Sequence, residues 1–116
     1  MNQMTGPDGT SNAARVVQTG KSNVSELTQN FGDNLSATVR QIGDGNRSTI
    51  DQSGAFFGVG NTIDVLQMAD DAVSTITQSG DNNAINVSQY TDAHFSSVTQ
   101  GGTGNTVTVT QGVAPM

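Results

Sequence analysis

The sequence predicts an all-β fold, a two-sheet β-solenoid of the cross-β type. Its units are 11-residue strand–turn segments that pair into repeats of 22–23 residues. Three observations predict this fold. Glutamines recur at a nearly constant spacing through almost the whole chain, and many are followed by a glycine two residues later and an asparagine five residues later. Apolar and polar residues alternate before each glutamine, which is typical of a strand buried on one face.

The glutamine period is the strongest of these signals. It is constant throughout the C-terminal third of the chain, slightly longer between Gln29 and Gln41, and longer still between Gln52 and Gln67. Both excesses fall in predicted turns, the larger one as an insertion at residues 53–60. A solenoid tolerates insertions there, because the strand register alone fixes which side chains face inward. The glutamines in phase are Gln18, Gln29, Gln41, Gln52, Gln67, Gln78, Gln89, Gln100 and Gln111.

The predicted strands end at these glutamines, and the inward face follows by counting back from each of them in steps of two. One sheet is expected from residues 12–18, 35–41, 61–67, 83–89 and 105–111, and the facing sheet from residues 23–29, 46–52, 72–78 and 94–100. Strands of the second sheet carry an inward serine where the first sheet carries an aliphatic residue, so that small side chains oppose large ones. The predicted apolar core is Ala14, Val16, Leu27, Ala37, Val39, Ile50, Ile63, Val65, Ile76, Ile85, Val87, Val98, Val107 and Val109.

Stacked amides are the second predicted feature of the interior. Glutamines in register lie one above another at the strand spacing of about 4.8 Å, so each amide can donate to the layer above and accept from the layer below. The same bonding is expected for asparagines at the other strand end. Glycine two residues after glutamine supplies the positive φ of a tight turn. The predicted asparagine ladder is Asn12, Asn23, Asn46, Asn61, Asn83 and Asn105.

Two turns, residues 68–72 and 90–94, lose glycine and asparagine together. They are predicted to lie on the same edge of the solenoid in adjacent layers. Asp70, Asp71 and Asp92 then stack near one another, and their like charges repel. Two interpretations stay open, ordinary variation in a solvated turn or gatekeepers that slow self-assembly.

Three phenylalanines are predicted to gather in the turns at one corner of the solenoid. Phe31 lies in the slightly longer unit that follows Gln29, and Phe56 and Phe57 lie in the insertion one layer away. One interpretation is a satellite hydrophobic cluster that folds back on its own edge. The other is an exposed patch that makes a lateral contact with a neighbouring molecule.

The repeats form one domain, residues 12–111, between two short tails. Residues 1–11 are expected to be disordered or to form a degenerate half-repeat in which Pro7 stands at the glutamine phase. Residues 112–116 form a C-terminal tail. Neither end carries the polar capping repeat that a soluble solenoid normally needs. The first ten residues lack the basic and apolar regions of a secretory signal, so a secreted protein is expected here in its mature form.

Composition argues against several classes of function. The net charge is −6 with only four Lys and Arg residues, so nucleic-acid binding is not expected. No apolar run approaches the length of about 18 residues that a membrane-spanning helix needs, so we predict no membrane insertion. The chain has no cysteine and one histidine, His94, which cannot complete a ligand set. We therefore predict no metal, no cofactor and no enzymatic activity.

The unit Gln-x-Gly-x-x-Asn-x5-Gln, doubled into a 22-residue repeat, resembles curlin over residues 12–111. Curlins are the secreted subunits of bacterial curli, functional amyloid fibres of the biofilm matrix. The resemblance implies an amyloid-type structural subunit, of the major type, that polymerises end to end outside the cell and mediates adhesion and aggregation. It also implies a nucleator subunit and a secretion machinery as partners. The alternative is a minor nucleator or adhesin-type curlin that seeds or caps the fibre; strong ladders in both terminal layers favour the major subunit.

Overall fold

The computed structural model describes residues 2–3 (backbone only), 12–30, 34–54 and 60–113. These residues form ten strands and no helix. The strands are β1 (Asn2–Gln3), β2 (Ala13–Thr19), β3 (Val24–Asn30), β4 (Ser36–Ile42), β5 (Arg47–Ser53), β6 (Thr62–Met68), β7 (Val73–Gln78), β8 (Ala84–Gln89), β9 (Phe95–Gln100) and β10 (Thr106–Gln111). Each of the nine strands predicted from the glutamine period is present within one residue of its expected bounds.

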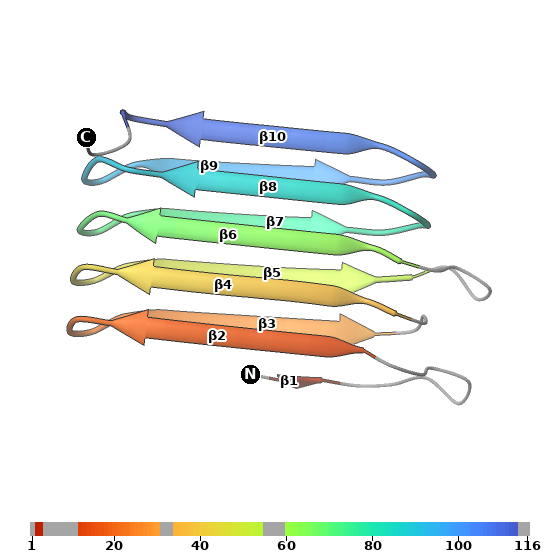
Figure 1. Cartoon of the computed structure of the whole chain (residues 1–116), viewed down its shortest axis with the longest axis horizontal. Coiled ribbons are helices and arrows are strands. Elements are labelled where there is room, and N and C mark those ends of the chain that lie inside the picture. Colours follow the sequence, from red (N-terminus) through yellow and green to blue (C-terminus); the bar gives the residue numbers. More distant parts are fainter. Residues whose placement is uncertain (1, 4–11, 31–33, 55–59, 114–116) are drawn as a thin grey trace.

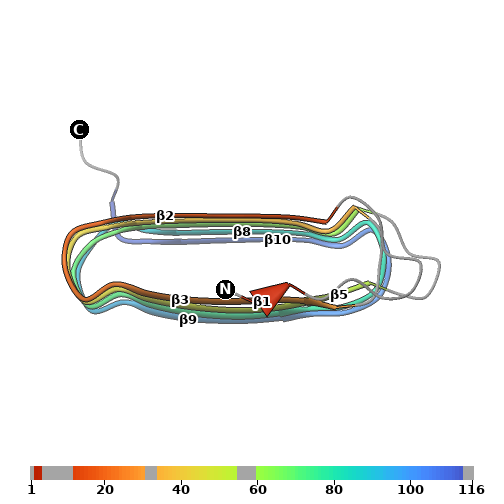
Figure 2. The same ribbon diagram turned by 90° about the horizontal axis from the view of Figure 1, so that it is seen from below.

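The strands form two parallel sheets that face each other (Figure 1). The odd sheet has the order β1-β3-β5-β7-β9 and the even sheet has the order β2-β4-β6-β8-β10. The chain alternates between the sheets, so β2 with β3, β4 with β5, β6 with β7 and β8 with β9 each make one layer. Viewed along the stack, the layers superimpose as a flattened ring with a turn at each narrow end (Figure 2). The predicted two-sheet solenoid is confirmed.

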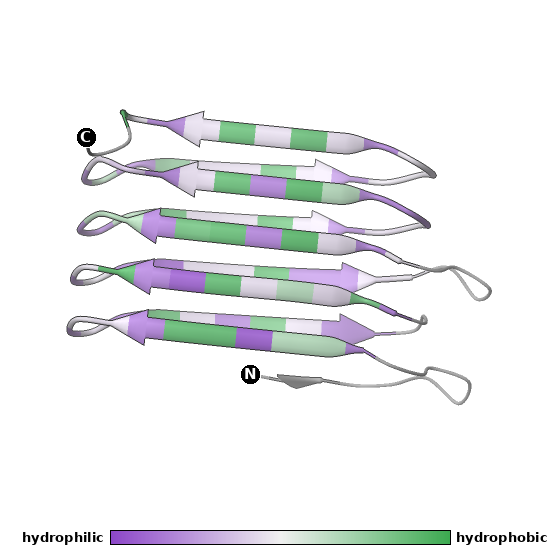
Figure 3. Ribbon diagram, viewed as in Figure 1, coloured by the Kyte–Doolittle hydropathy of each residue, from purple (hydrophilic) through white to green (hydrophobic). Residues whose placement is uncertain are grey.

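The register of the strands explains why the core is continuous. Neighbouring strands align glutamine with glutamine, for example Gln41 with Gln67. The aliphatic residues two and four positions earlier in the two strands align with each other in the same way. Buried and more exposed positions therefore alternate along β4–β9. Hydropathy alternates in the same way along β10 (Figure 3). The buried apolar cluster is Leu27, Ala37, Val39, Ile50, Ile63, Val65, Ile76, Ile85, Val87 and Val98, with Ala14, Val16, Val107 and Val109 partly buried at the two ends of the stack.

Turns at one edge of the stack pack backbone against backbone. Gly20 and Gly43 have φ of 115° and 120°, in the region that side chains disfavour. A Cβ atom on Gly20 would lie 2.0 Å from the Gly43 carbonyl oxygen, and one on Gly43 would lie 2.3 Å from the Ala69 oxygen. Glycine is therefore required here both for the turn conformation and for the close approach of the next layer.

A short strand precedes the repeats. β1 pairs with the outer edge of β3, with Asn2 opposite Thr28 and Gln3 opposite Gln29. The register thus puts Gln3 at the glutamine phase that was predicted for Pro7, a residue outside the described part of the chain. As a result, one end of the stack shows β1 and β2, and the other shows β9 and β10.

Candidate functional site: amide columns and open ends

The in-phase glutamines form two columns of hydrogen-bonded side chains. In the even sheet, Nε2 of each glutamine donates to Oε1 of the next, from Gln18 to Gln41 at 2.7 Å and onward through Gln67 and Gln89 to Gln111 at 2.8 Å each. The odd sheet repeats this arrangement. Gln29 donates to Gln52, Gln52 to Gln78, and Gln78 to Gln100, at 2.9–3.0 Å.

These side chains point into the solenoid and also join the two sheets. Gln67 is fully buried, and its Nε2 donates to the carbonyl oxygens of Arg47 at 3.1 Å and Ala72 at 3.0 Å, in addition to Gln89. Arg47 begins β5 in the facing sheet, so the amide bridges the sheets at the point where a turn closes the layer. Burying so many polar groups is tolerable because their hydrogen bonds are made inside the protein.

The asparagines bond differently from the expectation of amide-to-amide contacts. Oδ1 of Asn61 accepts the backbone N–H of Asn83 at 3.0 Å, and Asn83 Nδ2 donates to the carbonyl oxygens of Ser79 at 2.8 Å and Gly102 at 2.7 Å. An asparagine side chain is one methylene shorter than glutamine and lies beside the turn, so backbone groups are its nearest partners. The six asparagines also belong to two separate edges. Asn23 and Asn46 lie in turns that lead into odd strands, and the other four lie at the opposite edge.

Other residues take the asparagine position in some layers. Leu35 is buried there, and its backbone N–H donates to Asn12 Oδ1 at 3.0 Å. Ala72 occupies the equivalent position above Asn46, whose Oδ1 accepts the Ala72 N–H at 3.0 Å. Leu35 was not predicted from the sequence in this role. The signal was present, because the one-residue excess in the turn before it displaces Asn34 from the column.

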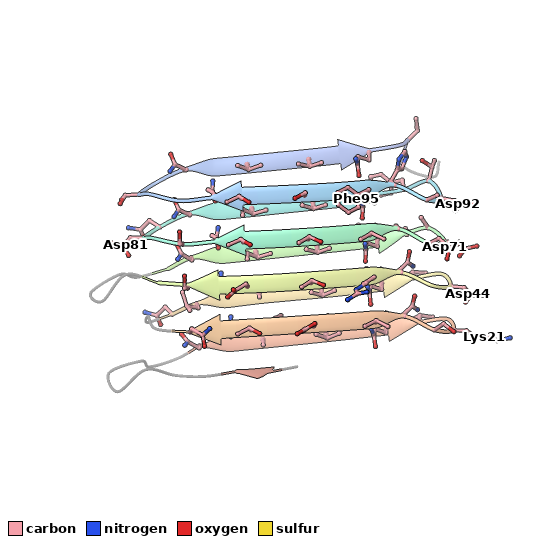
Figure 4. All side chains as sticks on the ribbon, turned by 180° about the vertical axis from the view of Figure 1, so that it is seen from behind. Lys21, Asp44, Asp71, Asp81, Asp92 and Phe95 are labelled. Atoms are coloured by element: carbon pink, nitrogen blue, oxygen red, sulfur yellow. The ribbon has the colours of Figure 1, made fainter. Side chains whose placement is uncertain are left out.

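A carboxylate column runs along the exposed edge of the turns from even to odd strands (Figure 4). The backbone N–H of Lys21 donates to Asp44 Oδ1 at 2.7 Å, that of Asp44 to Asp70 Oδ1 at 2.7 Å, and that of Asp70 to Asp92 Oδ1 at 3.0 Å. Of the three candidate gatekeepers, Asp70 and Asp92 are therefore stacked neighbours in this column. Asp71 lies one position further along its turn. Asp44 is an additional member, recognisable in the sequence because it also lies three residues after a glutamine.

Of the phenylalanines, only Phe95 lies within the described residues, and its side chain is 63% exposed. The predicted lateral contact of Phe31, Phe56 and Phe57 falls outside the described part of the chain.

The ends of the stack differ from its middle. Inward residues of the central layers, such as Val39 and Val65, are fully buried, whereas Val16 at one end and Val109 at the other are only partly covered. β10 and β9 each have a strand partner on one side only within the described chain. Gln100, at the end of the odd column, is 5% exposed, and its Nε2 has no hydrogen-bond partner among the described residues.

The described residues offer little else that could carry chemistry. Within them, no three acidic, histidine or cysteine side chains are grouped to hold a metal ion. His94 makes one side-chain hydrogen bond, between its Nε2 and Thr91 Oγ1 in an exposed turn. A search of the same residues for a helix long and apolar enough to cross a membrane finds none.

Fold and site together define a class of protein, a parallel β-solenoid whose repeats are held by interior amide columns. Among the described residues, the outer strand edges at its two ends have no partner. The family model of the curlin associated repeat matches residues 32–55, 58–90 and 80–112, which together make up more than half of the chain. The chain therefore belongs to the curlin repeat family, as its glutamine and asparagine spacing indicated. This family consists of structural amyloid subunits found in extracellular curli fibres. Comparison with curated proteins gives no match.

Proposed function

We propose that this chain is a curli-type structural subunit of the major type, without enzymatic activity. It polymerises end to end into extracellular amyloid fibres, and these fibres mediate adhesion and aggregation. The observation that supports this most is a full-length strand of the even sheet at each end of the stack, whose outer edge has no strand partner among the described residues. Soluble proteins normally shorten, charge or cover such edges. Here β2 and β10 have seven and six residues and remain uncovered by other described segments.

The two open edges are complementary in register. Arg15 aligns with Thr38, and the alignment continues through the even sheet to Thr108 in β10. A second copy whose β2 lies on β10 with Arg15 opposite Thr108 therefore continues the same register. Gln18 then lies above Gln111, and the glutamine column passes from one copy to the next.

Apolar residues at the ends also gain cover in this arrangement. Ala14 and Val16 are in register with Val107 and Val109 through the intervening strands, and all four are only partly buried in the single chain. Stacking removes these side chains from water, which favours association by about 25 cal/mol for each Å² of apolar surface buried.

Replacing Thr108 by proline tests the proposal. The carbonyl oxygens of Asn105, just before β10, and Gln111, at its end, accept hydrogen bonds from the N–H groups of Ala84 and Tyr90 on the β8 side. Backbone groups alternate in direction along a strand, so the N–H of Thr108 faces the open edge. Proline is tolerated at such an edge position but cannot donate to an added strand.

We expect the unmodified chain alone to give a sigmoidal thioflavin-T curve and unbranched fibres with a reflection at about 4.7 Å. Thr108→Pro should keep the far-ultraviolet circular dichroism of the single chain and lose fibre growth. Thr108→Val, which keeps the N–H, is the matched control and should grow normally. Normal growth of the proline variant would show that copies do not join through this edge.

The alternative, a minor nucleator or adhesin-type subunit that seeds or caps a fibre, predicts a different outcome in the same assay. Such a subunit forms few fibres alone and accelerates the growth of another subunit at low molar ratio. By family resemblance, a major subunit requires a nucleator and a secretion machinery as partners. Extracellular location can be checked by immunogold labelling of intact cells that express the chain with its secretion partners.

A further inference from the structure

The two ends of the stack are uneven, and each carries half a layer on a different sheet. β10 belongs to the even sheet and has no odd strand beside it among the described residues (Figure 1). β1 belongs to the odd sheet and has no even strand beside it within the same part of the chain. In the part of the chain that the structure describes, no odd strand therefore lies above β9, and one additional odd strand lies below β3.

This unevenness has a geometric consequence for any end-to-end stack. When β2 of a second copy pairs with β10, β3 of that copy lies two strand spacings above β9, which is about 9.6 Å. One strand fills such a gap. β1 of the second copy is already paired with its own β3, on the side that faces β9 of the first copy.

The register of the odd sheet is consistent with this fit. Thr28 aligns with Asp51, Thr77 and finally Thr99, and Gln29 aligns in the same way with Gln100. Because Asn2 pairs with Thr28 and Gln3 with Gln29, β1 of a second copy is in register with Thr99 and Gln100 of the first.

Gln100 supplies an independent indication. Every other glutamine of its column within the repeats donates from Nε2 to the glutamine one layer above. Gln100 is buried, and its Nε2 is without a partner among the described residues. In each lower layer of this column, the residue that accepts the Nε2 donor is a glutamine. The residue that the register of β1 puts at this position above Gln100 is also a glutamine, Gln3 of the second copy.

The backbone of β9 also has free groups at this edge. The carbonyl oxygens of His94 and Gln100 accept the N–H groups of Val73 and Ser79 on the β7 side. By strand alternation, the N–H groups of Phe95, Ser97 and Thr99 and the C=O groups of Ser97 and Thr99 face the vacant position, whereas the Phe95 carbonyl oxygen accepts from Gln111 Nε2 at 2.8 Å. The described residues of β1, placed in this register, lie opposite Thr99 and Gln100 and can pair with the free groups of Thr99.

We propose that residues Asn2–Gln3 of one copy complete the odd sheet of the neighbouring copy by pairing in register with Thr99 and Gln100. The N-terminal segment is then part of the joint between subunits, inserted between β9 of one copy and β3 of the next. This inference rests on the proposed end-to-end polymerisation and specifies how the joint is closed.

Disulfide trapping tests the joint, and the absence of native cysteine makes the experiment unambiguous. The pair Asn2→Cys with Thr99→Cys reports insertion of the segment. The pair Arg15→Cys with Thr108→Cys reports stacking of β2 on β10 without involving the segment. The pair Asn2→Cys with Thr108→Cys is the matched control, because its two positions belong to opposite sheets.

Within one copy, the members of each reporter pair lie four strand spacings apart, about 19 Å, which is too far for a disulfide. Across the proposed joint they are adjacent strand partners, within the Cα separation of about 4.4–6.8 Å that a disulfide spans. Fibres of each variant are grown under reducing conditions, oxidised, dissolved in denaturant and separated on a non-reducing gel.

We expect covalent multimers from both reporter pairs and monomer from the control pair. Multimers from the Arg15/Thr108 pair with monomer from the Asn2/Thr99 pair would overturn the insertion and leave end-to-end stacking intact. Fibres in which neither reporter pair cross-links would overturn the proposed joint altogether. Failure of the unmodified chain to form fibres would overturn the proposed function, and the insertion with it.

Discussion

Gln67→Leu is the substitution that should reveal how much the interior amide columns stabilise the fold. Leucine has a similar volume, so it keeps most of the packing while removing every hydrogen bond of the side chain. Gln67 donates to Gln89 Oε1 and to two carbonyl oxygens, and its own oxygen accepts from Gln41 Nε2. Its two amide protons are therefore shared among three acceptors.

The size of the effect follows from these contacts. A typical intramolecular hydrogen bond contributes about 1 kcal/mol net, and a buried group left without a partner costs about 1–3 kcal/mol. Loss of the contacts of Gln67 in the buried interior should therefore lower the free energy of unfolding by about 3–5 kcal/mol. Gln18→Leu is the matched control. Gln18 is exposed and donates to Gln41 alone among glutamines. The same chemical change there removes one donor from Gln41 Oε1, so it should cost about 1–2 kcal/mol.

The measurement is guanidinium unfolding of the single chain, followed by far-ultraviolet circular dichroism at concentrations where sedimentation velocity shows a monomer. We expect a large decrease in the midpoint for Gln67→Leu and a small one for Gln18→Leu. Equal decreases, or a Gln67→Leu chain as stable as the parent, would refute the view that the buried amides hold the layers together.

Two further substitutions test the turns. Gly80→Ala should destabilise the chain by about 1–3 kcal/mol, because Gly80 has φ of 96° and an added Cβ would lie 2.0 Å from the Gly102 carbonyl oxygen. Gly101→Ala, where the nearest atom is 3.4 Å away, should be tolerated in the same melting experiment. The double change Asp70→Asn with Asp92→Asn keeps both acceptor oxygens and removes a repulsion of about 1 kcal/mol between stacked carboxylates. If these residues are gatekeepers, the double variant should have a shorter thioflavin-T lag than the parent chain at low salt. Added salt, which screens the carboxylates and should shorten the lag of the parent, should have little effect on the lag of the variant. An unchanged lag at low salt would favour the interpretation that these turns show ordinary sequence variation.

The period of the sequence determined the strands, their register and the core, because a strand buried on one face leaves an alternating pattern that a turn insertion does not disturb. Contacts within the turns were harder to predict. The bonding of Asn61 and Asn83 to backbone depends on how close successive turns approach, which spacing does not report. Residues 1–11 were left as either disordered or a degenerate half-repeat, with Pro7 at the glutamine phase, because two strand residues carry no alternation. The interval from Gln3 to Gln18 equals the interval from Gln52 to Gln67, and that equality was the available signal.

The amide columns also have a direction. All seven glutamine-to-glutamine hydrogen bonds run the same way, from the Nε2 of the layer nearer the N-terminus to the Oε1 of the layer above it. Side-chain dipoles therefore align along the stack instead of cancelling. A filament built from such copies has a donor end, marked by Gln100 and Gln111, and an acceptor end, marked by Gln18. Its two tips are chemically distinct, so a filament extended from a labelled seed should lengthen at unequal rates in its two directions.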